Sequence, residues 1–251
     1  MKQAEPTPGG KTSGPQPSQV ADFVRVDGTR RRTNRRKIAL LGSFMAGFFA
    51  LWTFRATSLY AIDEAIASPI LRALYSNMVK LLIWVLPAVG FVYWGEGTSP
   101  TKYLGLVHLP QPDQWRPCLL ATAAFLVATA AFELSVAGKA ISLAPLTLPP
   151  LIIGLISSPL FEEILFRGLV LKELMSLLPL TFANMFTSVL FVAAHLPYWL
   201  SHGGLTRSMM ANCAGIFLFS LLAGWLFARS KSIWPPTLAH IANNLLASLL
   251  I

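Results

Sequence analysis

Long apolar runs separated by short polar segments dominate the chain after residue 37. Each approaches the ~20 residues that an α-helix needs to cross ~30 Å of hydrocarbon. The predicted spans are residues about 38–54, 79–95, 117–137, 147–172, 179–196, 208–228 and 233–251. A chain in lipid must satisfy its backbone hydrogen bonds within each segment, so the pattern predicts an all-α, polytopic membrane helical bundle of about seven transmembrane helices.

The segments outside these runs differ in character. The stretch 55–78 carries charged residues among apolar ones, which predicts an amphipathic interfacial helix or, alternatively, part of a further span. The stretch 96–116 is rich in Gly, Pro and charge, which is typical of a loop. Residues 1–37 have few large apolar side chains to offset the entropy of ordering. We therefore expect a disordered basic tail, followed by a transmembrane domain at 38–251.

Composition also favours a membrane protein. Apolar residues make up 54% of the chain and charged residues only 12%, whereas soluble domains carry about 25% charged residues. The net charge of +9 is unevenly distributed, because a basic cluster directly precedes the first apolar run. The cluster consists of Arg30, Arg31, Arg32, Arg35, Arg36 and Lys37. No aromatic residues interleave it, so we expect anionic lipid headgroups rather than nucleic acid as its partner.

The basic residues also predict the orientation of the chain, because cytoplasmic loops carry an excess of Lys and Arg. With the N-terminus in the cytoplasm, most basic residues beyond the tail lie on the cytoplasmic side: Lys102, Arg116, Arg167, Lys172, Arg229 and Lys231. Lys139 and Arg207 lie on the other side. We therefore expect a multi-pass protein of the plasma (inner) membrane with a cytoplasmic N-terminus.

Three polar islands interrupt the apolar segments of the second half of the chain. They are the pair Glu162 and Glu163, His195, and His240 with Asn244. A carboxylate at the centre of a membrane costs about 2.5 to 3.5 kcal/mol on insertion scales. Two adjacent carboxylates therefore need partners, a water-filled cavity or a function, which makes these islands the candidate site.

Helical spacing separates the two carboxylates. Glu163 and Arg167 are four residues apart, so they share a face and we expect them to form a salt bridge. Glu162 points about 100° away from that pair. We therefore expect Glu162 to carry the chemistry, while Glu163 and Arg167 give structural support.

The remaining islands have helical spacing too. Phe191 and His195 share a helix face, as do His240 and Asn244. A hairpin of the fourth and fifth spans would bring His195 to the depth of Glu162. Each residue taken alone has a simpler explanation, since a membrane His or Asn often only bridges helices by a hydrogen bond. Their convergence favours a functional site.

At these residues the chain resembles the CAAX protease and bacteriocin-processing family of intramembrane endopeptidases, also called the Abi family. The family's motif Glu-Glu-x-x-x-Arg corresponds to residues 162–167. Phe-x-x-x-His corresponds to Phe191 and His195, and His-x-x-x-Asn to His240 and Asn244. The similarity covers about residues 147–251, and it implies a four-helix catalytic core there.

The resemblance also implies a glutamate-dependent peptidase. Glu162 would activate a water molecule, and His195 would help to orient or deprotonate it. His240 and Asn244 would stabilise the oxyanion of the tetrahedral intermediate, with Phe191 as a supporting residue. The implied substrate is a membrane-anchored or lipidated protein or peptide, reached within the lipid bilayer.

We expect no metal and no other cofactor. A zinc-dependent version of the same protease is the alternative, since two His and a Glu make an acceptable zinc site. Cys118 and Cys213 lie in apolar segments without ligand spacing. A non-catalytic membrane immunity or scaffold protein is the main rival function. A proton-coupled transporter is disfavoured by the short chain without an internal repeat.

Overall fold

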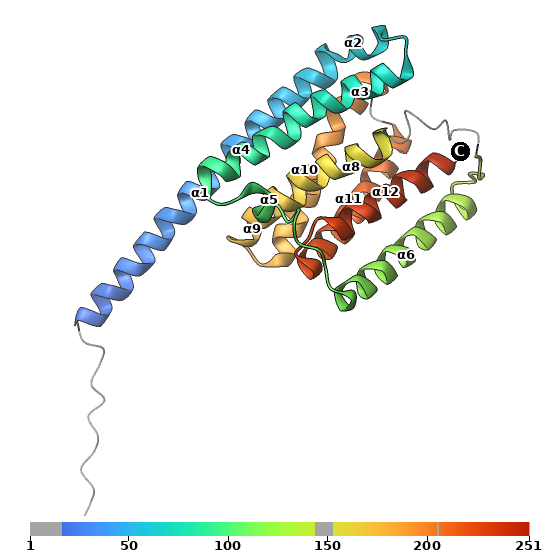
Figure 1. Cartoon of the computed structure of the whole chain (residues 1–251). Coiled ribbons are helices and arrows are strands. Elements are labelled where there is room, and N and C mark those ends of the chain that lie inside the picture. Colours follow the sequence, from blue (N-terminus) through green and yellow to red (C-terminus); the bar gives the residue numbers. More distant parts are fainter. Residues whose placement is uncertain (1–16, 144–152, 205, 251) are drawn as a thin grey trace, which may run out of the picture. The chain divides into compact units, whose positions relative to one another are not determined.

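The computed structural model describes residues 17–143, 153–204 and 206–250, with side chains described for 34–143, 154–204 and 206–250. The described elements are α1 (Pro17–Ser58), α2 (Tyr60–Ala65), α3 (Pro69–Lys80), η1 (Leu81–Val85), α4 (Leu86–Gly95), α5 (Pro100–Tyr103), α6 (Pro112–Ser135), η2 (Ile153–Ser157), α8 (Ser158–Glu163), η3 (Ile164–Leu171), α9 (Lys172–Met175), α10 (Leu180–His202), α11 (Arg207–Ser230) and α12 (Trp234–Leu249) (Figure 1). These elements confirm the all-α prediction.

Five of the described helices are long and apolar enough to cross a membrane: Asn34–Ser58, Pro69–Gly95, Pro112–Ser135, Leu180–His202 and Arg207–Ser230. They correspond to five of the predicted spans. The other two predicted spans are also helical. One is the continuous run η2–α8–η3–α9, and the other is α12, which has only 16 residues. Residues 147–152 of the predicted fourth span lie outside the described part of the chain.

The second span begins much earlier than the apolar pattern predicted, at Pro69 rather than near residue 79. The helix start there has clear local causes. Pro69 occupies the first helical position, where its missing N–H costs nothing, and the hydroxyl of Ser68 accepts a hydrogen bond from the Leu71 N–H. The stretch 55–78 is therefore not a single interfacial helix. Its second half belongs to a span, as the alternative prediction had it.

The chain divides into two compact units with the boundary between Gly42 and Ser43. Helix α1 begins at Pro17, so residues 17–37, which we expected to be disordered, are helical in the structure. A helix that has nucleated in an apolar segment can extend into a flanking segment by adding one hydrogen bond per residue. Residues 1–16 of the predicted tail lie outside the described residues.

Within the second unit, one end of the bundle is built around the segment 96–111. Tyr103 donates a hydrogen bond to Glu173 of α9. The Trp234 Nε1–H donates to the Leu106 carbonyl at 2.9 Å, which joins the start of α12 to the same segment. We call this the Tyr103 end. Gly168 of η3 lets this helix approach Leu104 closely, since a Cβ at residue 168 would lie 2.9 Å from the Leu104 carbonyl oxygen.

The opposite end holds α2, the last turn of α10 and the end of α12. The hydroxyls of Tyr60 and Tyr198 lie 3.4 Å apart, which links α2 to α10. The Ser142 N–H donates to the Leu249 carbonyl at 2.8 Å, which links the chain after α6 to the end of α12. We call this the Tyr60 end. Each spanning helix of the second unit runs between the two ends, so the depth of a residue follows from its position in its helix.

Candidate active site

The two adjacent carboxylates lie on α8, and both are buried. Glu162 is 5% exposed and Glu163 is fully buried. Pro159 lies inside the helical run that begins at Ile153, directly after the π-helical turn η2, and as a proline it donates no backbone N–H there. The helix continues without a break into η3, which carries Arg167. Two successive side chains of such a helix point in different directions, so each carboxylate has its own surroundings.

Glu163 is part of a buried network. Its Oε1 accepts a hydrogen bond from Arg167 at 3.1 Å, and the same oxygen lies 2.9 Å from His240 Nδ1. The Arg167 guanidinium also donates to Ser220 of α11, to the carbonyl at 3.0 Å and to the hydroxyl at 2.8 Å. The predicted salt bridge between Glu163 and Arg167 is confirmed, and it joins η3 to α11 and α12.

Glu162 has a different partner, which lies far away in the sequence. Lys80 of α3 forms an ion pair with Glu162 Oε1 and donates to the Ser158 hydroxyl at 2.5 Å. Ser158 in turn donates to Glu162 Oε1 at 3.1 Å. The Lys80 ammonium also lies 4.6 Å from the centre of the Trp84 ring, a distance at which a cation is attracted to the ring face.

The second oxygen of Glu162 is the reactive candidate. Oε2 is buried without a hydrogen-bond partner among the described residues. It lies 3.7 Å from His240 Nε2, too far for a direct hydrogen bond. The carboxylate is therefore held through one oxygen and leaves the other available near an imidazole. Glu162 is not bonded to Arg167, as the helical spacing predicted.

His195 and His240 are each fixed through Nδ1. His195 Nδ1 lies 2.8 Å from the Phe191 carbonyl, and a carbonyl oxygen can only accept, so Nδ1 carries the proton. His240 Nδ1 faces the Glu163 carboxylate, so the same assignment holds there. In the neutral form of either ring, Nε2 is then an acceptor.

Phe191 packs at the centre of this group. Its ring lies 4.6 Å from the Arg167 guanidinium and makes edge contacts with both imidazoles, at 5.1 Å from the centre of His195 and 5.8 Å from that of His240. It is 1% exposed. Phe191 thus contacts Arg167 and both imidazoles, while its supporting role stays a prediction.

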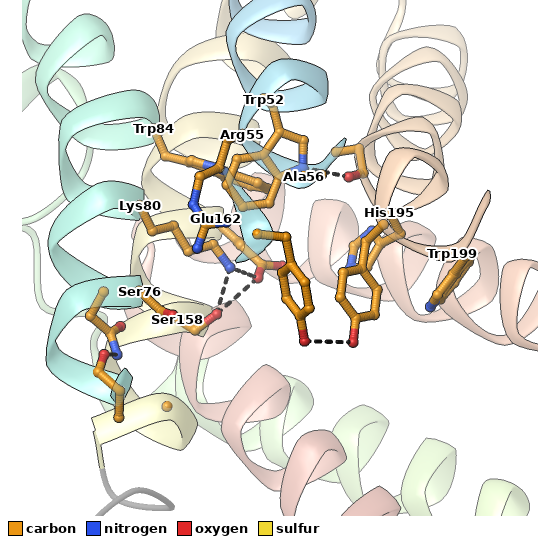
Figure 2. A pocket seen from close by; sticks show the side chains of 16 residues that line it. Trp52, Arg55, Ala56, Ser76, Lys80, Trp84, Ser158, Glu162, His195 and Trp199 are labelled. Atoms are coloured by element: carbon orange, nitrogen blue, oxygen red, sulfur yellow. Dashed lines mark hydrogen bonds and ion pairs between the residues drawn. The ribbon is translucent and has the colours of Figure 1, made fainter. Parts of the chain in front are cut away.

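A cavity of about 390 Å³ lies beside Glu162. Its lining comes from α1, α2, α3, η1, η2, α8 and α10. Figure 2 shows Glu162, Lys80 and Ser158 on one side of the cavity and His195 with Trp199 on the other. The structure thus brings Glu162 and His195 to one cavity. His240 lies close to both carboxylates but is not among the described residues that line the cavity.

Asn244 is placed less favourably than the motif implied. It lies one turn beyond His240 on α12 and is half-buried. Neither Asn244 nor His240 is among the described residues that line the cavity. A contact between Asn244 and a substrate would therefore require some movement of α12 or of the side chain.

The main residue that sequence reasoning missed is Lys80. The predicted second span began at about residue 79, so Lys80 stood at its start and was given no role. With the helix beginning at Pro69, Lys80 lies 11 residues inside a 27-residue span. A lone cation so deep in an apolar helix is the signal that could have identified it, since such residues usually pair with an opposite charge.

No group of three or more His, Cys, Asp or Glu side chains among the described residues lies in an arrangement that could hold a metal ion. The Lys80 ammonium, bonded to the Glu162 carboxylate, occupies a position where a cation would otherwise neutralise that charge.

Comparison with known proteins covers the second half of the chain. Residues 144–246 match the family described as "Type II CAAX prenyl endopeptidase Rce1-like". A protein of Bacillus subtilis (strain 168) with the name "Putative membrane peptidase YdiL" is 31% identical over 94 residues, which are 38% of this chain and 34% of that relative. The chain thus spans about a third of the relative's length. No solved structure matches the chain.

Fold, site and comparisons define a multi-pass, all-α membrane protein with buried Glu and His residues on neighbouring helices. The three motifs of residues 162–167, 191–195 and 240–244 all lie within the matched region. The match of residues 144–246 to a CAAX prenyl endopeptidase family confirms the resemblance.

Replacing Glu163 by Ala should destabilise the fold severely. Arg167 would keep its charge in a fully buried position without its acidic partner, and breaking a buried pair in this way costs about 3 to 5 kcal/mol. The thermal unfolding midpoint of the purified protein in detergent should fall, and the yield of folded protein with it.

The ion pair between Glu133 and Lys139 provides the control. Its carboxylate and ammonium lie 2.8 Å apart, but the two side chains are 26% and 41% exposed. Glu133→Ala should therefore cost less than about 1 kcal/mol. A Glu163→Ala variant as stable as Glu133→Ala would contradict a structural role for the Glu163–Arg167 pair.

Proposed function

We propose that the protein is an intramembrane endopeptidase in which Glu162 activates water to hydrolyse a peptide bond. One observation carries the proposal. Glu162 is held by Lys80 through Oε1, while Oε2 has no hydrogen-bond partner among the described residues and lies 3.7 Å from His240 Nε2. A buried carboxylate with one free oxygen beside a cavity is suited to accept a proton.

The comparisons support the same class of reaction. The matching family is named for a prenyl endopeptidase and the Bacillus subtilis relative for a membrane peptidase. The region that the family match covers includes Glu162, His195 and His240. We extend the peptidase activity to this chain on the strength of those residues.

The charges of the resting site are balanced. Glu162 is paired with Lys80 and Glu163 with Arg167, so neither imidazole needs a proton to compensate a buried carboxylate. With His240 neutral, its Nε2 and Glu162 Oε2 are two acceptors 3.7 Å apart. A water molecule that donates one hydrogen to each would have its lone pairs directed away from them, toward the substrate carbonyl.

The proton then follows a closed path. As the water oxygen bonds to the carbonyl carbon, its proton passes to Glu162 Oε2. Collapse of the tetrahedral intermediate breaks the C–N bond, and Glu162 returns the proton to the leaving nitrogen. The products are a carboxylic acid and an amine, which exchange a proton with solvent after release, and the site regains its starting charge. His195, on the opposite wall of the cavity, would orient the water or the substrate through Nε2.

The oxyanion of the intermediate needs N–H donors. We propose His240 and Asn244 for this role, with a condition on His240. Because its Nδ1–H is directed to Glu163, Nε2 can donate only if the ring takes up one further proton from solvent before the attack. That proton would stay on the ring through the cycle, and Glu162 alone would then hold the water. The Glu163 carboxylate would stabilise that charge. A well-placed donor of this kind is worth about 100-fold to 1,000-fold in rate in comparable hydrolases.

We infer the substrate class from the environment of the site. The cavity lies among membrane-spanning helices, so the substrate is a membrane-anchored or lipidated protein or peptide that reaches it from the bilayer. We also propose the plasma (inner) membrane, with the N-terminus in the cytoplasm, because of the basic cluster before the first span.

Glu162→Gln should abolish cleavage while leaving the protein folded. Gln keeps the shape of the side chain but cannot accept the proton, and loss of a general base costs about 100-fold or more in rate. The substrate-independent measurement is mass spectrometry of membrane-protein termini in cells that express either form. Termini that depend on the wild-type protein should disappear with Glu162→Gln.

Glu133→Gln provides the control, because it removes a carboxylate at the end of α6, away from the cavity lining. Its termini should match those of the wild-type protein. If the wild-type protein generates no new termini, or if Glu162→Gln generates the same ones, the glutamate mechanism is wrong and a scaffold function becomes the better explanation.

Lys80 should act as a positioning residue for Glu162. Lys80→Met keeps the length of the side chain but removes the charge, so Glu162 would lose its ion pair and the direction of Oε2. We expect a loss of kcat with little change in KM, because Lys80 holds the base rather than the substrate. Lys80→Arg should recover part of the activity. Equal kcat values for Lys80→Met and the wild-type protein would contradict this role.

We propose that the chemistry needs no metal, with support from the Lys80–Glu162 ion pair, which competes with metal binding at the carboxylate. The purified protein should retain its activity in a strong chelator, and elemental analysis should find no stoichiometric zinc. Loss of activity in the chelator, restored by added zinc, would favour the zinc-dependent alternative.

A further inference from the structure

We infer that the indole N–H of Trp84 donates a hydrogen bond to the carbonyl oxygen of the scissile peptide bond, a role that rests on the proposed function and deepens it. Trp84 belongs to the second span, outside the matched region 144–246. It lines the cavity of Glu162 and carries a buried donor that no described residue uses.

The Trp84 side chain is 1% exposed, and its Nε1 is buried without a hydrogen-bond partner among the described residues. Trp is a donor only, so the partner of this N–H has to be an acceptor. Leaving a buried donor without a partner costs about 1 to 3 kcal/mol. Most buried polar groups in native proteins are paired, and an exception indicates a bound water or a functional contact.

The ring and charge contacts of the indole offer no such acceptor. Phe48, Trp52 and Phe166 make edge contacts with it, at 5.0, 5.0 and 5.7 Å between ring centres. The Lys80 ammonium lies 4.6 Å from the centre of the Trp84 ring and can only donate. An aromatic face can receive an N–H, but such a contact is weaker than a bond to oxygen. This leaves the cavity, which Trp84 lines, as the source of the acceptor.

Other donors in the cavity lining are already engaged. Trp52 of α1 donates its Nε1–H to a carbonyl of α10 at 2.7 Å. Lys80 and Ser158 donate to Glu162. Trp84 differs from these three because its N–H is buried and has no partner among the described residues. A water molecule can accept this bond in the resting cavity, and a peptide carbonyl can replace that water.

Trp84 lies close to the reactive carboxylate. Lys80 forms the ion pair with Glu162, and the same ammonium faces the Trp84 ring. One side chain thus separates the carboxylate from the indole, and Figure 2 shows both on the same side of the cavity. A substrate carbonyl whose carbon is next to a water on Glu162 Oε2 therefore has its oxygen near the indole.

The backbone at Trp84 is irregular. Residues Leu81–Val85 form the π-helical turn η1, shortly before Pro87. Pro87 donates no backbone N–H, so the turn before it cannot keep the regular α-helical bonding. π-Helical turns inside α-helices are rare and occur frequently at functional sites. The irregular turn is an independent sign that this position serves the cavity rather than the regular packing of the helix.

An indole N–H suits the charge that develops on the carbonyl oxygen. As the water oxygen bonds to the carbonyl carbon, the C=O π electrons move to oxygen and strengthen its hydrogen bond to Trp84. When the C–N bond breaks, the carbonyl re-forms, and Trp84 has gained and lost no proton. His240 can donate through Nε2 only after taking up a proton, and Asn244 is not among the described lining residues. Trp84 needs neither a proton nor a movement of α12.

Removal of the N–H alone tests this role. Benzothienylalanine, introduced by codon suppression, has the shape of Trp with sulfur in place of the indole N–H. The substrate is a peptide that spans one of the termini dependent on the wild-type protein. With this analogue in place of Trp84, we expect kcat to fall about 100-fold and KM to change little, because the bond strengthens only in the transition state. The ratio to the wild-type kcat should be the same at every pH, because the indole N–H does not titrate.

Two other tryptophans provide matched controls. Trp94 is 83% exposed at the end of α4, and the same analogue there should leave kcat unchanged. At Trp52 the analogue removes a hydrogen bond within the protein, so the thermal unfolding midpoint should fall. At Trp84 the midpoint should not fall, because no such bond is lost. An equal fall at Trp84 and Trp52 would reveal a partner within the protein and contradict the donor role.

The results separate the role of Trp84 from the proposed function. If the wild-type protein generates no termini, the proposed function is wrong, and the role of Trp84 with it. If termini appear and the Trp84 analogue keeps the wild-type kcat, or changes only KM, the donor role is wrong while the glutamate mechanism stands. A kcat ratio that varies with pH as an imidazole titrates would assign the effect to His195 or His240 and would also contradict the inference.

Discussion

The burial of two adjacent carboxylates is the constraint on which the rest of the site depends. Neither charge is tolerable in an apolar bundle alone, and each is compensated by a cation from a different place. Arg167 comes from the same helix, one turn away, whereas Lys80 comes from another span. Because each carboxylate has its own cation, the two are free to serve different purposes. Each keeps its Oε2 without a hydrogen-bond partner among the described residues, but Glu163 holds helices together, whereas Glu162 lines the cavity.

Lys80 makes the site larger than the region that the family match covers. It belongs to the second span, well before residue 144, and Trp52 of the first span donates a hydrogen bond to the Ala194 carbonyl at 2.7 Å, next to His195. The four-helix core from about residue 147 onward therefore does not complete the site by itself. The preceding spans supply the counter-ion of Glu162 and one wall of the cavity.

What the sequence could predict was set by the distance along the chain between interacting groups. The Glu163–Arg167 bridge was predictable because helix geometry alone brings residues four apart together. The approach of His195 to the cavity of Glu162 followed from a hairpin with arms of equal length. The Lys80–Glu162 pair spans 82 residues and depends on how two helices pack, which no local pattern encodes. The early start at Pro69 hid the depth of Lys80 as well.

The anchoring of the two imidazoles limits the chemistry that the site can perform. Both rings use Nδ1 to hold their positions, one on a backbone carbonyl and the other on Glu163. In their neutral forms both therefore present Nε2 as an acceptor, which suits the orientation of water rather than the stabilisation of an oxyanion. In the resting state each carboxylate has its own cation, Lys80 for Glu162 and Arg167 for Glu163. A cationic His240 would require one further proton taken up before the attack, and Glu163, which is fully buried and hydrogen-bonded to the same ring, is the group that would stabilise that charge.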